Sequence, residues 1–257
     1  MDISPISQNR FQRILAILND RERVNVLELS EALSVSPVTV RRDLDKLNRL
    51  GLLERIHGGA VASKRRPLEI PFEKKGQVSV SEKQAIAQYA ASLVRPGDTI
   101  FLNSGTTTQR VVQHLKGVPV RVVTNNSATA QMELDPAVEL ILIGGEYRSQ
   151  SSSLVGDIAL SNLSSIYCSH AFLGVNGVCP DKGLTSSVYQ ETSINRIMIE
   201  HTQERVVVLA DSTKVGKVST FFSAPVNAMH TLITDCHCPE HHVARFVEAG
   251  VEVYRAP

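Results

Sequence analysis

The chain has 257 residues, of which 42% are hydrophobic and 21% charged, so it holds enough apolar surface for a core and is not a disordered chain. Residues 1–66 carry 12 basic and 8 acidic side chains, whereas residues 67–257 carry 15 and 18, and a basic head of this kind points to a polyanion as its partner. The chain lacks an apolar run of about 18 residues, a signal-peptide core near Met1 and a cysteine framework, which together favour a reduced, cytoplasmic protein.

The N-terminal part predicts three helices followed by a hairpin. Apolar residues at helical spacing define the first two helices. Ser36 is a good N-cap and Pro37 suits the first helical position, so a third helix begins there with Val40, Leu44 and Leu47 inward. The expected elements are helices over residues 8–19, 29–33 and 37–50, and two short strands within residues 52–61 around Gly58 and Gly59. This order is the outline of a winged helix-turn-helix domain, which we place at residues 7–62.

Residues 63–80 have the composition of a linker, because Pro67 and Pro71 interrupt any regular element. A helix is expected to begin near Ser81. Strand-like and helix-like segments then alternate, which predicts a parallel α/β domain over residues 81–257. The expected strands are residues 99–102, 120–123, 140–143, 171–175, 205–210, 231–234 and 251–254, and the expected helices are residues 107–115, 158–163, 193–204 and 239–248.

Polar side chains on the third helix and the hairpin are candidates for contact with DNA. One arginine can bind guanine O6 and N7 through two hydrogen bonds, and hydroxyl groups at a helix start suit phosphates. On charge and helix count alone, a small helical domain with ordinary solvated arginines remains the alternative. The candidate DNA-binding residues are Ser36, Thr39, Arg41, Arg42, Lys46, Arg55 and His57.

Polar and glycine-rich loops follow several predicted strands of the second domain. The carboxyl ends of parallel strands meet at one edge of a sheet, where α/β proteins bind their ligands. Hydroxyl groups, backbone N–H groups and one lysine in these loops suit a sugar phosphate; ordinary turn chemistry is the alternative for each loop taken singly. The candidate ligand-binding residues are Asn103, Ser104, Gly105, Thr106, Thr107, Thr124, Asn125, Asn126, Gly144, Gly145, Gly174, Asn176, Gly177, Glu191, Asp211 and Lys214.

The recognition-helix segment from Ser36 to Leu44, with Gly51, Arg55 and the run from His57 to Ala60, resembles the N-terminal domain of the DeoR family of bacterial transcriptional repressors. The second domain is similar to the sensor of the same family, whose landmarks recur here at Ser104–Thr107, Thr124–Asn125, Gly144–Gly145, Gly174–Gly177, Thr185 with Glu191, and Asp211–Lys214. Asn103 departs from this pattern, because the family commonly has Asp there.

The resemblance implies a winged-helix head on an α/β sensor that is similar in fold to ribose-5-phosphate isomerase. It further implies a DNA-binding repressor of a sugar or polyol operon, released from operator DNA by a phosphorylated sugar or polyol, and a homo-oligomer of two or a larger even number of chains. The residues do not distinguish repression from activation, so a transcriptional activator remains an alternative.

The sequence offers little support for a metal site, a nucleotide cofactor or catalysis. Cys236, Cys238, His241 and His242 do not have the spacing of a zinc site, and the sequence has neither a P-loop nor a dinucleotide fingerprint, so we expect no metal and no cofactor. The alternative function is a sugar-phosphate isomerase-like enzyme with an accessory helical domain, with Asp211, Lys214 and Glu191 as acid and base. The arginine-bearing helix and the glycine hairpin have no evident use in an enzyme, so we favour the regulator and expect no catalysis.

Overall fold

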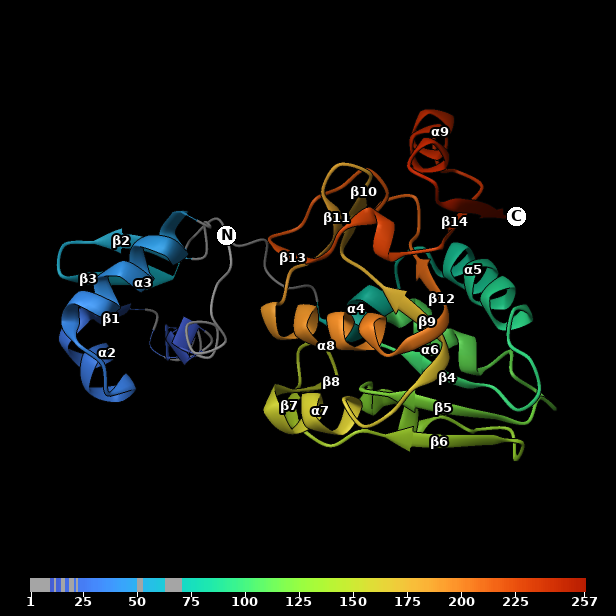
Figure 1. Cartoon of the computed structure of the whole chain (residues 1–257), viewed down its shortest axis with the longest axis horizontal. Coiled ribbons are helices and arrows are strands. Elements are labelled where there is room, and N and C mark those ends of the chain that lie inside the picture. Colours follow the sequence, from blue (N-terminus) through green and yellow to red (C-terminus); the bar gives the residue numbers. More distant parts are fainter. Residues whose placement is uncertain are drawn as a thin grey trace. The chain divides into compact units, whose positions relative to one another are not determined.

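In the computed structural model the chain forms two compact units, Met1–Glu69 and Ile70–Pro257 (Figure 1). The described residues are 10–11, 13–14, 17–18, 21, 23–49, 53–62 and 71–257. We call the first unit the head and the second the sensor, and each is described by itself. Within the described residues, no helix is long and apolar enough to cross a membrane.

The head contains the helices and the hairpin that its sequence predicts. The described residues between 10 and 21 are helical, with Phe11, Ile14 and Leu18 buried; Leu15 and Gly51 lie outside the described residues. The following elements are β1 (Arg23–Asn25), α2 (Val26–Leu33), α3 (Pro37–Arg49), β2 (Leu53–Ile56) and β3 (Gly59–Ala62). The strands form one antiparallel sheet in the order β1-β3-β2.

Side-chain caps fix where the two helices of the helix-turn-helix begin. Asn25 accepts the Glu28 N–H at 2.8 Å, and the Glu28 carboxylate accepts the Asn25 N–H at 3.2 Å, so a capping box starts α2. Ser34, in the left-handed conformation at φ 54°, ends α2. Ser36 accepts the Thr39 N–H at 3.2 Å and starts α3, as its sequence predicts. Strand β1 was not expected, because three residues are too few to show a period.

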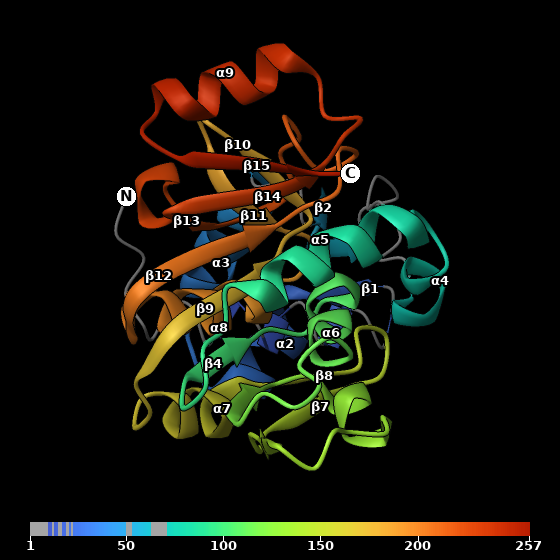
Figure 2. The same ribbon diagram turned by 90° about the vertical axis from the view of Figure 1, so that its right-hand side faces the viewer.

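The sensor is built on a parallel seven-stranded sheet with the order β15-β14-β12-β9-β4-β5-β6 (Figures 1 and 2). Each of these strands overlaps one of the seven predicted from the sequence. Their bounds are β4 Thr99–Leu102, β5 Val120–Thr124, β6 Val138–Leu142, β9 Cys168–Gly174, β12 Thr202–Leu209, β14 Thr231–Asp235 and β15 Glu252–Ala256.

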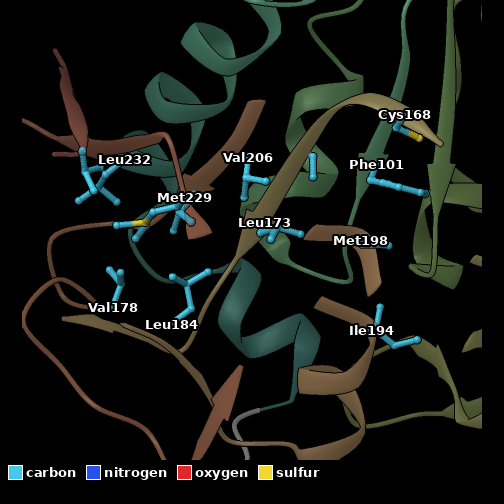
Figure 3. Packing of buried hydrophobic residues seen from close by; sticks show 14 of the residues in the cluster. Phe101, Cys168, Leu173, Val178, Leu184, Ile194, Met198, Val206, Met229 and Leu232 are labelled. Atoms are coloured by element: carbon cyan, nitrogen blue, oxygen red, sulfur yellow. The ribbon is translucent and has the colours of Figure 1, made fainter. Parts of the chain in front are cut away.

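Helices cover both faces of this sheet, which explains why its strands read as nearly continuous apolar runs. One face packs against α5 (Val80–Ser92) and α6 (Thr106–Val112), with Ile86 and Val111 in its core. The other packs against α7 (Gly156–Leu163), α8 (Tyr189–Glu200) and α9 (Glu240–Glu248), and Figure 3 shows part of that core, including Ile194 and Met198. The sensor is therefore a doubly wound α/β domain.

Shorter elements complete the sensor. Two of them make a hairpin, three make a small antiparallel sheet, and two are single 3-10 turns. They are β7 (Glu146–Arg148), β8 (Ser153–Val155), β10 (Gly177–Cys179), β11 (Gly183–Ser186), β13 (Phe221–Ala224), η1 (Ser127–Gln131) and η2 (Val226–Ala228). The predicted helix over residues 193–204 is wrong in position, because α8 begins at Tyr189 and residues 202–204 already extend β12.

Residues 71–80, which composition assigns to the linker, contain a short helix of the sensor. This helix, α4 (Phe72–Gly76), is tied to the sensor by the Phe72 N–H, which donates to the Gln150 carbonyl at 2.8 Å. Arg110 on α6 donates to the Gly76 carbonyl at 2.9 Å. The segment is too short and too charged to show an apolar period, so its sequence does not reveal the helix.

Candidate nucleic-acid interface and effector site

Helix α3 presents a basic face. Val40, Leu44 and Leu47 are fully buried, whereas Arg41, Arg42 and Lys46 are exposed on the other side of the helix. An exposed pair of adjacent guanidinium groups has the geometry for reading base edges from a helix in the major groove. The structure thus leaves all three predicted cations of α3 accessible to a partner.

The two hydroxyl residues at the start of α3 bond each other. Ser36 Oγ and Thr39 Oγ1 lie 2.9 Å apart, in addition to the cap that Ser36 forms with the Thr39 N–H. Their first role is therefore local, since together they fix the start of α3. A contact of either hydroxyl group with a DNA phosphate would be a second role, beside the capping of α3.

Arg55 braces the hairpin against α3. Its Nε donates to the Asp45 carboxylate at 3.0 Å, its guanidinium also donates to the Gly59 carbonyl, and its backbone N–H donates to Asn48 Oδ1 at 3.2 Å. His57, in contrast, is exposed in the turn between β2 and β3. Arg55 and His57 are the two candidate DNA contacts of the hairpin. Among the described residues of the head, the Arg55 side chain is held by hydrogen bonds, whereas that of His57 is not.

A buried ion pair that sequence reasoning missed joins the first helical segment to α3. The guanidinium of Arg10 donates through two nitrogens to the carboxylate of Asp43, which is 3% exposed. The pair raises the pKa of Arg10, chiefly through these hydrogen bonds. A signal was present, because Asp43 occupies the position three residues after Val40 on the buried stripe of α3.

In the sensor, Asn103 links the ends of two neighbouring strands. Its Nδ2 donates to the Gly174 carbonyl and to Asn195 Oδ1, both at 2.8 Å, and its Oδ1 accepts the Gly174 N–H at 2.8 Å. The side chain is 6% exposed. Only a group that both donates and accepts can make all three bonds, so the amide fits where a carboxylate, which only accepts, does not.

We therefore expect Asn103→Asp to destabilise the sensor by about 1–3 kcal/mol at pH 7, because the Gly174 carbonyl loses its donor and meets an acceptor. Lowering the pH restores a donor on the carboxyl and reduces the loss. Urea unfolding at pH 7 and pH 4.5 measures both effects. Asn162→Asp is the control, since among the described residues the exposed Asn162 side chain acts only as an acceptor, for the Gly144 N–H at 3.1 Å; equal stability of the two variants contradicts this role of Asn103.

The loop after β5 lies beside the loop after β4. Asn125 is fully buried; its Nδ2 donates to the Leu154 carbonyl at 3.1 Å and to Ser104 Oγ at 3.4 Å, and its Oδ1 lacks a partner among the described residues. Asn126 donates to the Gly105 carbonyl at 3.5 Å. The structure thus brings together the candidates from these two loops. Thr107 and Thr124 are buried, and Thr124 Oγ1 accepts the Asn126 N–H.

Two further groups of candidates are engaged within the protein. Asn176 Oδ1 accepts the Ser187 N–H at 3.0 Å. The single Ser186 hydroxyl proton is within hydrogen-bond distance of both Asn176 Oδ1, at 3.1 Å, and the Glu191 carboxylate, at 3.0 Å. Gly144 and Gly145 pack near the start of α7, where a Cβ on Gly145 would lie 2.6 Å from the Val155 carbonyl oxygen. A Cβ on Gly177 would lie 2.7 Å from the Lys217 carbonyl oxygen. Close backbone packing explains both glycine positions.

Several charged side chains lie within electrostatic range of Lys83, including Asp211 and Lys214 from the turn that follows β12. Asp211, 4% exposed, accepts from the Thr213 N–H, and the Lys214 N–H donates to the Asp211 carbonyl at 2.8 Å. Lys83 on α5 is 5% exposed, and its ammonium donates to the Lys75 and Val78 carbonyls at 2.5 and 2.7 Å. We call Lys75, Lys83, Arg110 and Lys214 the cation cluster.

The charges of this cluster act on one another. Burial is the largest cause that lowers the pKa of Lys83 below its ordinary 10.5. Asp211 opposes the shift, while Lys214, Arg110 and Lys75 add to it. Three further cations and one buried carboxylate therefore lie within electrostatic range of the Lys83 ammonium, and this excess of positive charge favours an anionic ligand.

Sequence reasoning found Lys214 and Asp211 but missed Lys83 and Arg110. The signal for Lys83 was its place on the buried stripe of α5, together with Ile86, Ala87 and Ala90. A lysine in such a position is costly unless it has a task. Arg110 gave no such signal, because it lies inside the expected helix, one turn after Thr106 and beyond the candidate residues of the loop that follows β4.

A helix-turn-helix head with exposed arginines, followed by a doubly wound α/β unit with a buried cationic site, defines a DNA-binding regulator with a sensor domain. Two family models match the chain: the DeoR-like helix-turn-helix domain over residues 10–66 and the DeoR C-terminal sensor domain over residues 78–236. The chain belongs to the DeoR family of transcriptional repressors.

Curated relatives match over nearly the whole chain. A lactose phosphotransferase system repressor of Streptococcus mutans is 36% identical over 89% of this chain and 92% of its own length. A putative aga operon transcriptional repressor of Escherichia coli O157:H7 is 32% identical over 96% and 93%. Both relatives are named as transcriptional repressors, in agreement with the family of this chain. A ribose 5-phosphate isomerase of Methanocaldococcus jannaschii aligns at TM-score 0.38 and 19% identity over 52% of this chain and 54% of that chain.

Proposed function

We propose that this protein represses a sugar or polyol operon in the cytoplasm and leaves its operator when a phosphorylated sugar or polyol binds the sensor. The observation that carries the proposal is the cation cluster around buried Lys83, which includes Lys214 from the turn that follows β12. A dianionic phosphate balances its charge through charge-assisted hydrogen bonds. The names of two relatives, a lactose phosphotransferase system repressor and a putative aga operon transcriptional repressor, support repression of a sugar operon.

In this proposal Arg41, Arg42, Lys46 and His57 contact operator DNA, while Arg55, Ser36 and Thr39 hold the recognition helix in place. Lys214 and Lys83 bind the phosphate, and the hydroxyl groups of Ser104 and Thr106 with buried Asn125 complete the polar lining. Asn103, Asn176 and Glu191 position these loops. The head assignments rest on the exposure and the hydrogen bonds described above, and those of Asn103, Asn125, Asn176 and Glu191 rest on their hydrogen bonds. Lys83 is assigned from its burial and its charged neighbours, and Ser104, Thr106 and Lys214 are assigned from the family landmarks.

The effector affinity should depend on pH in a defined way. A phosphate ester becomes a dianion above its second pKa of about 6, so affinity rises with pH through that value. An anion binds the charged form of Lys83, and the pKa of Lys83 lies below 10.5. Affinity should therefore fall again as the pH rises through the pKa of Lys83. Calorimetric titration between pH 5 and pH 10.5 measures the profile; an affinity that does not fall by pH 10.5 contradicts a role for this ammonium.

The function itself is tested with full-length protein. A duplex selected from a random pool serves as operator, and fluorescence anisotropy follows its release by glucose 6-phosphate, galactose 6-phosphate, fructose 6-phosphate, ribose 5-phosphate and glycerol 3-phosphate. We expect at least one phosphate ester to weaken operator binding and its unphosphorylated parent to have no effect. Failure of the protein to select any duplex would overturn the assignment as a repressor.

We further propose that the protein acts as a homo-oligomer of two or a larger even number of chains. One head covers few base pairs, and two heads on two half-sites gain affinity and specificity. Light scattering of the full chain, free and on the selected duplex, tests this. A monomer in both states would contradict it.

A further inference from the structure

A cavity of about 320 Å³ lies in the sensor among α4, α6, η1 and the β7–β8 hairpin. Volumes of this size accept a small metabolite. Thr106 is the only candidate from the sequence that lines it. Figure 2 shows α4 beside α6, and the hydrogen bond from Arg110 to Gly76 joins them. The cavity is thus a part of the sensor that the motifs did not indicate.

The lining has the chemistry that carbohydrates need. Phe72 and Tyr147 supply aromatic faces against which the C–H groups of a sugar ring pack, and Gln109 and Gln131 supply planar amides that both donate to and accept from hydroxyl groups. An apolar effector would leave these amides unpaired. The mixture therefore favours a polyhydroxy ligand.

Arg110 marks the anionic end of this ligand. It lines the cavity, and its buried Nε has no partner among the described residues, although an arginine carries five donors. Arg110 also belongs to the cation cluster through its charge on Lys83. Thr106, one helical turn earlier, lines the cavity directly after Gly105. Arg110 and Thr106 thus connect the cavity to the strand-end site.

We infer that this cavity holds the sugar part of the effector, with the phosphate toward Arg110 and the cation cluster, and that Phe72, Tyr147, Gln109 and Gln131 determine which sugar is accepted. The inference rests on the proposed function. The four specificity residues all lie outside the family landmarks. Helix α4 contributes to the lining of the cavity, so it would contact the bound ligand. The ligand therefore touches the first sensor helix that follows the head in sequence.

Calorimetry on full-length variants tests the inference with the sugar phosphates named above and with inorganic phosphate as reference. Tyr147→Ala should weaken the best sugar phosphate about 5- to 10-fold and leave inorganic phosphate within about 2-fold, because only the ring contact is lost. Gln131→Ala, a smaller change, should alter the order of preference among the sugars. Tyr167→Ala is the matched control, since Tyr147 and Tyr167 are 61% and 62% exposed.

Each outcome has a distinct meaning. Hydrogen exchange should slow in residues 72–76 and 127–131 when the sugar phosphate binds to the wild type. Unchanged sugar-phosphate affinity in both cavity variants overturns the subsite while the proposed function stands. Equal losses for sugar phosphate and inorganic phosphate also overturn it, because the residues then act on the whole site. A wild type that binds none of the sugar phosphates overturns the proposed function, and the subsite with it.

Discussion

Replacing Arg41 or Arg42 with Ala is expected to weaken operator binding about 5- to 150-fold, because a base-reading arginine contributes about 1–3 kcal/mol. Both side chains are exposed on the face of α3 opposite to its buried residues, so their removal leaves the head's core intact. An arginine that reads a base should relax the preference at one position of the operator. Lys46→Ala, by contrast, should weaken all sequences alike and reduce the salt dependence by about one phosphate contact.

Anisotropy titrations with operator and random duplex at one salt concentration separate these effects. Arg121→Ala is the control, since Arg121 is exposed in the sensor and pairs only with Glu139 among the described residues. Operator affinities of Arg41→Ala and Arg42→Ala that equal the wild type would show that α3 is not the recognition helix.

The second large effect is expected for Lys214→Ala, which should weaken the sugar-phosphate effector about 10- to 100-fold. A charge-assisted hydrogen bond to phosphate contributes about 1.5–3 kcal/mol. The variant should keep its melting temperature, because the Lys214 backbone, rather than its side chain, closes the turn at Asp211. Operator binding should persist, so the repressor no longer responds to its inducer.

Thr106→Val should act in the same direction with a smaller loss, since it removes one hydroxyl and keeps the shape. Lys182→Ala, an exposed lysine in the turn between β10 and β11, is the matched control. The opposing view treats Lys214 and Thr106 as parts of structural turns; it predicts that stability and operator binding fall together. Variants that stay folded and keep the full effector response would remove both residues from the site.

The sequence was informative where local rules agree with the fold. All seven strands of the main sheet were predicted because buried parallel strands are short apolar runs, and the start of α3 was predicted because Ser36 and Pro37 determine it locally. The shift of α8 shows the limit of periodicity, since Thr202–Glu204 fit a helix by composition but extend β12 beside β9.

The site was harder to predict because it depends on contacts between distant segments. Asn103 was expected in a ligand pocket, but its amide is committed to Gly174 and Asn195, which lie 71 and 92 residues later. The cavity was missed for the same reason: α4 is five residues long, and η1 and β7 meet it only in the folded chain. Lys83 was missed as well, although its place on the buried stripe of α5 was a signal that the sequence carried.

The central claim is that effector and operator oppose each other through one conformational equilibrium. Linkage requires that a saturating effector weaken operator binding by the same factor by which operator weakens effector binding. Both factors are measured with one full-length preparation, by anisotropy of the selected duplex with and without effector and by calorimetry of the effector with and without duplex. We predict equal factors of at least about tenfold. An effector that binds the sensor tightly and leaves operator affinity unchanged would contradict the account.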